Sequence, residues 1–270
     1  MAASPRVSVV IPAFQSRWLD QALDSVRAQT FPSYEIVVVD DGSPVPLQPA
    51  KRDDVVVVRQ TNTGPGGARN RGVAVARGEL IAFLDSDDRW RPQMLERQVA
   101  WMDANPTAVL VFTGVHLDGR NPRDESYAHL LDPRSGRLPY GVLFEENMIP
   151  TSCAMIRRQA YLRTPGMSLH RRLGEDYALW LRIALLGEVG FIDEVLLDRR
   201  VHTGSLMAGA SRDATIEADL EIYEELFAEH PELRGAFAPR ALARVEFQRG
   251  YECLATARWA GARQAFARSL

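Results

Sequence analysis

The 270-residue chain is poor in cysteine and contains no long apolar run. Its two cysteines, Cys153 and Cys253, lie far apart without Cys-x-x-Cys spacing, which argues against a disulfide framework or zinc site and favours free thiols in a reducing compartment. No apolar stretch approaches the ~18 residues that span a membrane, and the run at 7–11 is too short for a secretory signal. We therefore expect a cytoplasmic protein without a transmembrane segment, while a peripheral membrane contact stays open.

An excess of basic charge is also absent. The chain has 32 Lys and Arg against 35 Asp and Glu, a formal net charge of -3. Nucleic acid is therefore not an expected partner, because proteins that bind it usually carry a basic surface. With 46% hydrophobic and 25% charged residues, the composition is that of an ordinary globular protein. The length suits one large domain, or one domain with an appendage.

Two common nucleotide-binding patterns are missing as well. The glycine-rich stretch 64–67 is not followed by Gly-Lys-Ser/Thr, so it is no P-loop, and no Gly-x-Gly-x-x-Gly follows the first predicted strand. Glycines at the start of a helix still let backbone N–H groups approach an anion. Arg69, just inside that helix, could pair with a phosphate or a ribose, although a lone Arg on a helix is more often a surface cation.

Strands and helices alternate through the first 115 residues. This alternation predicts βαβ units, and hence an α/β fold with a mostly parallel sheet covered by helices on both faces. We expect strands at 7–11, 35–39, 55–59, 80–84 and 108–113, and helices at 18–29, 68–76 (closed by Gly78) and 91–105.

The second half is less regular. It begins with a long polar loop at 118–140, a kind of segment that is usually functional. We then expect a strand at 151–157, a helix at 177–186 and two short strands at 188–193 and 195–201. From 212 to 270 the pattern is helical and could serve interaction or dimerisation. This tail should form about three amphipathic helices, broken near Pro231 and Pro239 and at Gly250 and Gly261.

Three predicted strands run into Pro or Asp where each one ends: Pro12, Asp40–Asp41 and Asp85–Asp87. Right-handed crossovers bring the ends of parallel strands to one edge of a sheet, where ligands bind in open α/β folds. The apolar run at 80–84 meets three carboxylates within four positions, which suggests a divalent cation held by oxygen ligands. A turn with solvated acids is the alternative.

Further candidate residues have ordinary alternatives. Phe14 could stack on a base and Asp41 could accept a ring N–H, but they could equally be a core aromatic and an Asx-turn residue. Either Glu175 or Asp176 could be a general base, although acids also cap helix N-termini. His202 could complete a metal site with the Asp cluster or be an ordinary surface histidine.

Four motifs then occur in order: Val-Ser-Val-Val-Ile-Pro-Ala-Phe, Asp-Asp-Gly-Ser, Asn-x-Gly-x-x-x-Ala-Arg-Asn-x-Gly and Phe-Leu-Asp-Ser-Asp-Asp. Together they resemble the family 2 glycosyltransferases of GT-A fold, closely over 6–115. The resemblance continues more loosely through Gly-Glu-Asp-Tyr-x-Leu-Trp-Leu-Arg and Val-His-Thr-Gly-Ser-Leu to about 210. It implies a GT-A (Rossmann-like) domain at 1–211, with a nucleotide-binding half (1–115) and an acceptor half (116–211), followed by a helical extension at 212–270.

The resemblance also implies a nucleoside-diphosphate sugar donor, most often of UDP, and Mn²⁺ or Mg²⁺. Donor contacts would come from Pro12, Phe14, Asp41, Gly64, Arg69, Asp85 and Ser86. The metal, at the DXD motif Asp85-Ser86-Asp87, would be held by Asp87 with Asp85 and His202, while Asp88 is left unassigned. Asp176, with Glu175 beside it, would be the catalytic base of an inverting, hexosyltransferase-type reaction.

Departures from the family pattern are few. Phe14 stands where Tyr is more usual and Gln15 where Asn is common. The Gln-x-x-Arg-Trp motif of polymer-making members is incomplete, because Ala255 precedes Arg258-Trp259. We therefore expect single addition to a carbohydrate or lipid-linked acceptor, in polysaccharide, glycolipid or glycoconjugate biosynthesis. The alternatives are a non-catalytic nucleotide-sugar scaffold and a sugar-1-phosphate nucleotidyltransferase, which should carry a basic Gly-rich loop after the first strand. The protein could form a homodimer through its helical tail.

Overall fold

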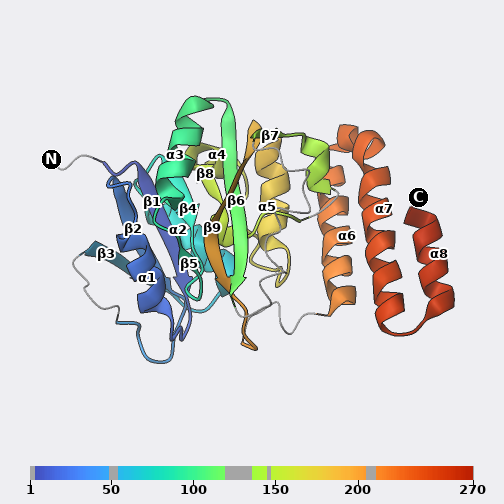
Figure 1. Ribbon diagram of the computed structural model, residues 1–270, viewed down its shortest axis with the longest axis horizontal. Coiled ribbons are helices and arrows are strands. Elements are labelled where there is room, and N and C mark those ends of the chain that lie inside the picture. The colour runs from blue at the N-terminus through green and yellow to red at the C-terminus, as the bar shows by residue number, and fades with distance from the viewer. Residues whose placement is uncertain (1–3, 49–53, 119–135, 145–146, 205–210, 270) are drawn as a thin grey trace.

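The computed structural model describes residues 4–48, 54–118, 136–144, 147–204 and 211–269 (Figure 1). The strands within these ranges form one mixed sheet flanked by helices, which confirms the predicted α/β class. The order across the sheet is β3 (Val55–Arg59), β2 (Tyr34–Asp40), β1 (Val7–Ala13), β4 (Leu80–Phe83), β8 (Met155–Arg157), β6 (Ala108–Asp118), β9 (Glu188–Arg200) and β5 (Arg89–Trp90), with β7 (Gly136–Leu138) paired to β9.

Strands β1 to β4 form the parallel part of the sheet. In their register Ala13 pairs with Asp40 and Asp40 with Arg59, so β1, β2 and β3 end level with one another. Helix α1 (Leu19–Arg27) connects β1 to β2 and buries its apolar stripe, as the spacing predicts. The expected meeting of polar strand ends at one edge is therefore present.

Helix α2 (Gly64–Val75) differs from its predicted bounds at both ends. It begins at Gly64, so the glycines of the motif lie within its first turn instead of preceding it. It ends at Val75, and Gly78 is not its cap. A Cβ at Gly78 would lie 2.5 Å from the backbone nitrogen of Ser8, so this glycine allows close passage of the chain beside β1.

The second half of the sheet is mixed. Strand β8 lies antiparallel between β4 and β6, while β6 and β9 are parallel. The prediction of two short strands at 188–193 and 195–201 was wrong, because β9 runs continuously past an irregularity where Ile192 pairs with Thr113 and Val195 with Gly114. Most of the predicted loop at 118–140 lies outside the described residues. The other helical elements between the strands are α3 (Met94–Ala104), η4 (Tyr140–Phe144), η5 (Thr151–Cys153), α4 (Arg158–Leu162) and α5 (Glu175–Ala184).

The tail folds as α6 (Arg212–Glu229), α7 (Pro231–Ala255) and α8 (Trp259–Ser269), which lie side by side in Figure 1 with α6 nearest the sheet. The predicted breaks at Pro239, Gly250 and Gly261 were wrong, since α7 continues through the first two and α8 through Gly261. A Cβ at Gly250 would lie 2.5 Å from the Phe266 ring, so this glycine lets α8 pack against α7. Buried residues of α6 and α7 belong to the same apolar core as the sheet. Among the described residues, no helix has the length and apolarity needed to cross a membrane.

Candidate active site

A pocket of about 790 Å³ opens at the edge where β1, β2 and β4 end. Its walls come from the N-terminus of α2, the segment after β4, η5, the N-terminus of α5, the end of β9 and the helices α6 and α7. Every residue that the sequence predicts for donor, metal or catalysis lines this one pocket: Pro12, Phe14, Asp41, Gly64, Arg69, Asp85, Ser86, Asp87, Glu175, Asp176 and His202.

Asp41 fixes the start of α2. Its carboxylate accepts the backbone N–H groups of Thr63 (3.0 Å) and Gly64 (2.9 Å), and the side-chain amide of Gln60 (2.8 Å). Gly64 adopts φ +82°, a conformation that favours glycine. A carboxylate at a helix N-terminus is stabilised by the free N–H groups there. Beside it, Phe14 leaves β1 with 48% of its surface exposed, so a ring face is free toward the pocket.

Three carboxylates gather after β4. Asp85, Asp87 and Asp88 each offer an oxygen, and these oxygens lie within 4.8 Å of one another. Burial, together with the charges of Asp85 and Asp87, raises the pKa of Asp88 to about 7. Such like-charge crowding favours a cation, and carboxylate oxygens are the donors that Mg²⁺ and Mn²⁺ prefer. The donor set therefore fits the predicted metal.

Ser152 of η5 holds this acidic segment in place. Its hydroxyl donates to Asp88 Oδ2 (2.6 Å) and accepts the backbone N–H of Asp85 (3.1 Å). The other Asp88 oxygen accepts the backbone N–H of Arg200 (2.9 Å), and Trp90 donates its indole N–H to the Ser152 carbonyl (2.6 Å). Asp88 is thus buried between η5 and β9, whereas Asp85 and Asp87 are partly exposed to the pocket.

His202 reaches the same cluster from the end of β9. Its Nε2 lies 2.8 Å from Asp87 Oδ2, while its Nδ1 accepts the backbone N–H of Gly204 (3.2 Å). The ring packs against Trp18, with centroids 4.4 Å apart. His202 and Asp87 are 115 residues apart in sequence, and the fold brings them into direct contact.

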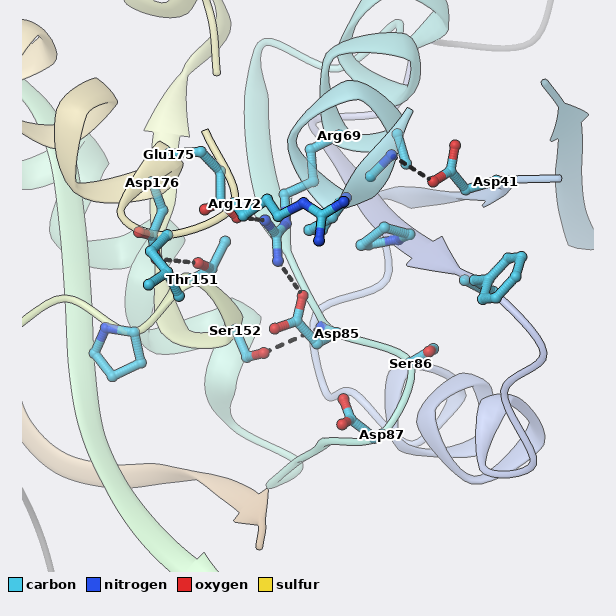
Figure 2. A pocket seen from close by; sticks show the side chains of 18 of the residues that line it. Asp41, Arg69, Asp85, Ser86, Asp87, Thr151, Ser152, Arg172, Glu175 and Asp176 are labelled. Atoms are coloured by element: carbon cyan, nitrogen blue, oxygen red, sulfur yellow. Dashed lines mark hydrogen bonds and ion pairs between the residues drawn. The ribbon is translucent and has the colours of Figure 1, made fainter. Parts of the chain in front are cut away.

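Arg69 connects the two halves of the pocket (Figure 2). Its guanidinium is buried and donates to Asp85 (2.6 Å) and to Glu175 (3.1 Å). It is therefore not the surface cation that a lone Arg on a helix would suggest. Burial opposes its charge, but Asp85 and Glu175 raise its pKa, so Arg69 stays protonated.

Glu175 and Asp176 begin α5 and differ in surroundings. Gly174 precedes them at φ +72°, and a Cβ there would lie 2.8 Å from Ile222 of α6. Burial, with the neighbouring charge of Asp176, raises the pKa of Glu175 to about 7 despite Arg69. Asp176 is partly exposed to the pocket, and its Oδ2 accepts the Thr151 hydroxyl (2.7 Å).

Several lining residues were not predicted from the sequence. Asp219 of α6 and Arg244 of α7 form a buried ion pair (3.1 Å), so the helical tail supplies part of the wall. Burial raises the pKa of Asp219, and the charge of Asp176 adds to this effect. Nothing in the local pattern marks these residues, because amphipathic helices commonly carry charges. The others of this kind are Trp18, Thr151, Ser152, Arg172 and Arg199.

Comparison with known sequences identifies the family. The sequence model described as glycosyl transferase family 2 matches residues 8–164. The chain belongs to glycosyltransferase family 2. An uncharacterized glycosyltransferase of Nostoc sp. is 32% identical over 229 residues, which are 79% of this chain and 70% of that protein. The succinoglycan biosynthesis protein ExoO of Rhizobium meliloti is 35% identical over 191 residues, which are 65% of this chain and 54% of that protein.

Solved structures show the same fold for this glycosyltransferase. S. aureus TarS 1–349, in complex with UDP-GlcNAc, superimposes with a TM-score of 0.68 at 17% identity, covering 97% of this chain and 90% of that one. The mannosyltransferase PcManGT of Pyrobaculum calidifontis, in complex with GDP-Man and Mn²⁺, gives a TM-score of 0.65 at 18% identity, covering 99% and 86%. Both support the GT-A fold that the motifs predict.

Proposed function

We propose that this glycosyltransferase transfers one sugar from a nucleoside-diphosphate sugar, with UDP favoured, to an acceptor hydroxyl with inversion at the anomeric carbon and in dependence on a divalent cation. The observation that carries the proposal is a single pocket. It joins an exposed aromatic at the end of β1, a cluster of three carboxylates after β4, and a partly exposed carboxylate, Asp176, on the opposite element α5. The nucleotidyltransferase alternative is set aside by the family assignment.

The donor would lie along the strand ends. Its base would lie between Phe14 and Pro12 and meet Asp41, with Gly64 and Ser86 near the ribose and phosphates. TarS, in complex with UDP-GlcNAc, and PcManGT, in complex with GDP-Man, support a nucleotide-sugar donor without choosing the base. The preference for UDP rests on the family resemblance. Arg69, held by Asp85 and Glu175, would shape the part of the pocket wall that the donor contacts.

Asp87 and Asp85 would hold the cation, with Asp88 beside them and His202 facing the cluster through Nε2. When bound, the cation would neutralise negative charge on the departing diphosphate. PcManGT was solved with Mn²⁺, which supports Mn²⁺ here, with Mg²⁺ as the second candidate. The chain's own contribution is to fix the carboxylates: Ser152 and Arg200 tie Asp88 in place, so the segment after β4 keeps its shape.

Asp176 is the proposed base. The acceptor oxygen would form the new bond to the anomeric carbon as the bond from that carbon to the diphosphate breaks, and the hydroxyl proton would pass to Asp176. The Thr151 hydroxyl, which donates to Asp176 Oδ2, leaves the carboxylate oriented toward the pocket. Glu175 is already engaged by Arg69, so its role would be to position that guanidinium.

The acceptor and the biological process are the least specified parts. We propose a carbohydrate or lipid-linked acceptor and a role in polysaccharide or glycoconjugate synthesis, supported by the resemblance to ExoO, a succinoglycan biosynthesis protein. The division at residue 211, with 116–211 as the acceptor half, stays a prediction about function, because α6 and α7 line the pocket and share the core of the sheet. The cytoplasmic location and a homodimer through the tail remain predictions.

A thermal-shift panel with UDP-glucose, UDP-galactose, UDP-GlcNAc and GDP-mannose tests the proposal. In the presence of Mn²⁺, at least one donor should raise the melting temperature, because a ligand that binds only the folded state stabilises it. Asp87→Ala should remove the Mn²⁺-dependent part of that shift. Asp103→Ala, an exposed carboxylate outside the pocket, is the control and should leave it intact.

Two results of this panel, and one result of a separate sugar-transfer assay, would count against parts of the proposal. If no donor shifts the wild-type protein, the donor assignment fails. An undiminished shift in Asp87→Ala would contradict the metal assignment. Donor binding without transfer to any hydroxyl acceptor or to water would favour the scaffold alternative.

A further inference from the structure

Three arginines that line the pocket, Arg17, Arg172 and Arg199, have no acidic partner among the residues that the structure describes. Arg172 is exposed, lines the pocket, and forms no hydrogen bond or ion pair within the described ranges. It belongs to the segment between α4 and α5, three positions before Glu175. Figure 2 shows its side chain reaching into the pocket from the α5 side. A guanidinium that has no partner in the described part of the chain is available to a ligand.

The segment that carries Arg172 is anchored on both sides. Asn70 of α2 clamps Met167 by two hydrogen bonds, since its amide donates to the Met167 carbonyl (2.7 Å) and its carbonyl accepts the Met167 N–H (2.9 Å). At the other side, the Arg171 side chain pairs with Glu221 (3.1 Å) and Glu225 of α6. Successive side chains therefore diverge: Arg171 binds α6, and Arg172 is left facing the pocket.

The other pocket arginines are mostly committed elsewhere. Arg69 is buried between Asp85 and Glu175, and Arg244 pairs with Asp219. Arg17 lies over the Trp18 ring, with its guanidinium carbon 4.1 Å from the centroid. Arg199, on β9, also lacks a hydrogen-bond or ion-pair partner among the described residues, but it is less exposed than Arg172. Arg172 is exposed, and its side chain reaches into the pocket with its donors uncommitted in the described part of the chain.

We propose that Arg172 binds the diphosphate of the nucleotide donor. The inference rests on the proposed function. A diphosphate that enters this pocket meets Asp85, Asp87 and Asp88, and it needs cationic partners to offset their repulsion. The fork of N–H donors on a guanidinium matches phosphate oxygens, and such charge-assisted hydrogen bonds are among the strongest in proteins. Because the diphosphate gains negative charge as it leaves, the contact strengthens during the reaction.

Isothermal titration with UDP, GDP, UMP and uridine, each with Mn²⁺ and with EDTA, tests this role. Arg172→Gln should weaken the binding of whichever nucleoside diphosphate the wild type takes by roughly tenfold, and uridine binding should not change. Arg172→Lys should recover part of the loss, because it keeps the charge but not the fork. The loss should shrink at high salt, since Arg172 is exposed.

Arg163→Gln is the matched control, because Arg163 is exposed in the same connection and lies outside the pocket. It makes the same charge change and should bind UDP or GDP like the wild type. If the wild type binds UDP or GDP and the Arg172→Gln variant binds it with equal affinity, the inference is overturned and the proposed function stands. A loss in Arg199→Gln but not in Arg172→Gln would also overturn it. A folded wild type that binds neither diphosphate would remove the proposed function, and this inference with it.

Discussion

The donor side of the pocket and its opposite side are built by different means. On the donor side, in residues 1–115, β1, β2 and β3 end level, and acidic motifs fall where strands stop, as with Asp41 after β2 and Asp85 after β4. On the opposite side, the wall is assembled from η5, the N-terminus of α5, the end of β9 and two helices of the tail. The N-terminus of α5 and the end of β9 carry motifs that match the family more loosely, and η5 and the tail helices carry none that the sequence analysis recognised.

The difference shows how sequence order becomes spatial order. In parallel βαβ units one rule brings all strand ends to one edge, so functional residues need only follow their strands. The opposite wall has no such rule, since β8 is antiparallel and α6 packs from outside the sheet. Arg69 joins the two sides, with Asp85 from one and Glu175 from the other. Perturbing each side separately tests how far the two depend on each other.

The largest effect should come from removing the tail. Truncation after residue 211 removes the α6 side chains Ile222, Tyr223 and Leu226 from the core. It also removes the ring contacts that Phe144 and Tyr177 make with Tyr223. Burying a large apolar side chain contributes about 1.5–3 kcal/mol, and domains are stable by only about 5–15 kcal/mol. We expect the truncated protein to lose its cooperative unfolding transition, measured by circular dichroism, and not to remain as a shorter active domain.

Truncation after residue 257 gives the matched comparison, because it removes only α8. The buried alanines of that helix, Ala262 and Ala265, lie outside the core cluster that contains the sheet. This shorter protein should unfold cooperatively and bind donor. A cooperative unfolding transition in the protein cut at 211 would show that the donor side folds without the tail.

The next largest effect should come from replacing the proposed base, which separates donor binding on one side of the pocket from sugar transfer on the other. Asp176→Asn should leave donor binding near that of the wild type, because Asp176 lies on α5 and contacts Thr151, away from the strand ends. Sugar transfer should fall by roughly 10²–10⁴-fold, the usual contribution of a general base. Titration of the donor and a kcat measurement would give the two values. Transfer at the wild-type rate would point to Glu175 or another group as the base.

The smallest effect should be on the pH dependence of stability, and it should come from Glu175, which pairs with Arg69 between the two sides. Folding raises the pKa of Glu175 to about 7, chiefly through burial, so the folded protein holds this proton more tightly than the unfolded chain. That contribution to stability is present below the unfolded pKa and is lost as pH rises toward 7. Urea unfolding of the wild type should therefore lose on the order of 2 kcal/mol more between pH 4.5 and pH 8 than Glu175→Gln. Parallel losses in the two proteins would contradict a raised Glu175 pKa.

Much of the fold could be predicted from local pattern. The four parallel strands and α1 lie close to where periodicity puts them, because β-branched runs and a helical apolar stripe carry their own signal. Errors occurred where tertiary contact overrides local preference. Gly250 predicts a break, but the approach of Phe266 makes a glycine useful inside α7. β9 looks like two strands because its pairing to β6 passes through an irregularity that no local signal marks.

The candidate site divides in the same way. All predicted site residues line the pocket, since their motifs sit at strand ends or at a helix N-terminus. What each group does there depends on partners that are distant in sequence. Asp88 could not be assigned from sequence because its environment comes from Ser152 and Arg200, 64 and 112 positions away. Arg172 gave no signal, since an exposed arginine in a loop is ordinary until its surroundings are known.

The sequence by itself determined the family, the alternation of strands and helices, and the row of polar residues at the strand ends. It could do so because these features are local patterns that a parallel sheet converts directly into position. Only the tertiary structure decided that Asp85 and Glu175 share Arg69 and that helices of the tail complete the wall, and it brought the predicted partners His202 and Asp87 into direct contact. These contacts join elements across 16 to 115 residues, and their charges and burial take their values only when the chain has packed.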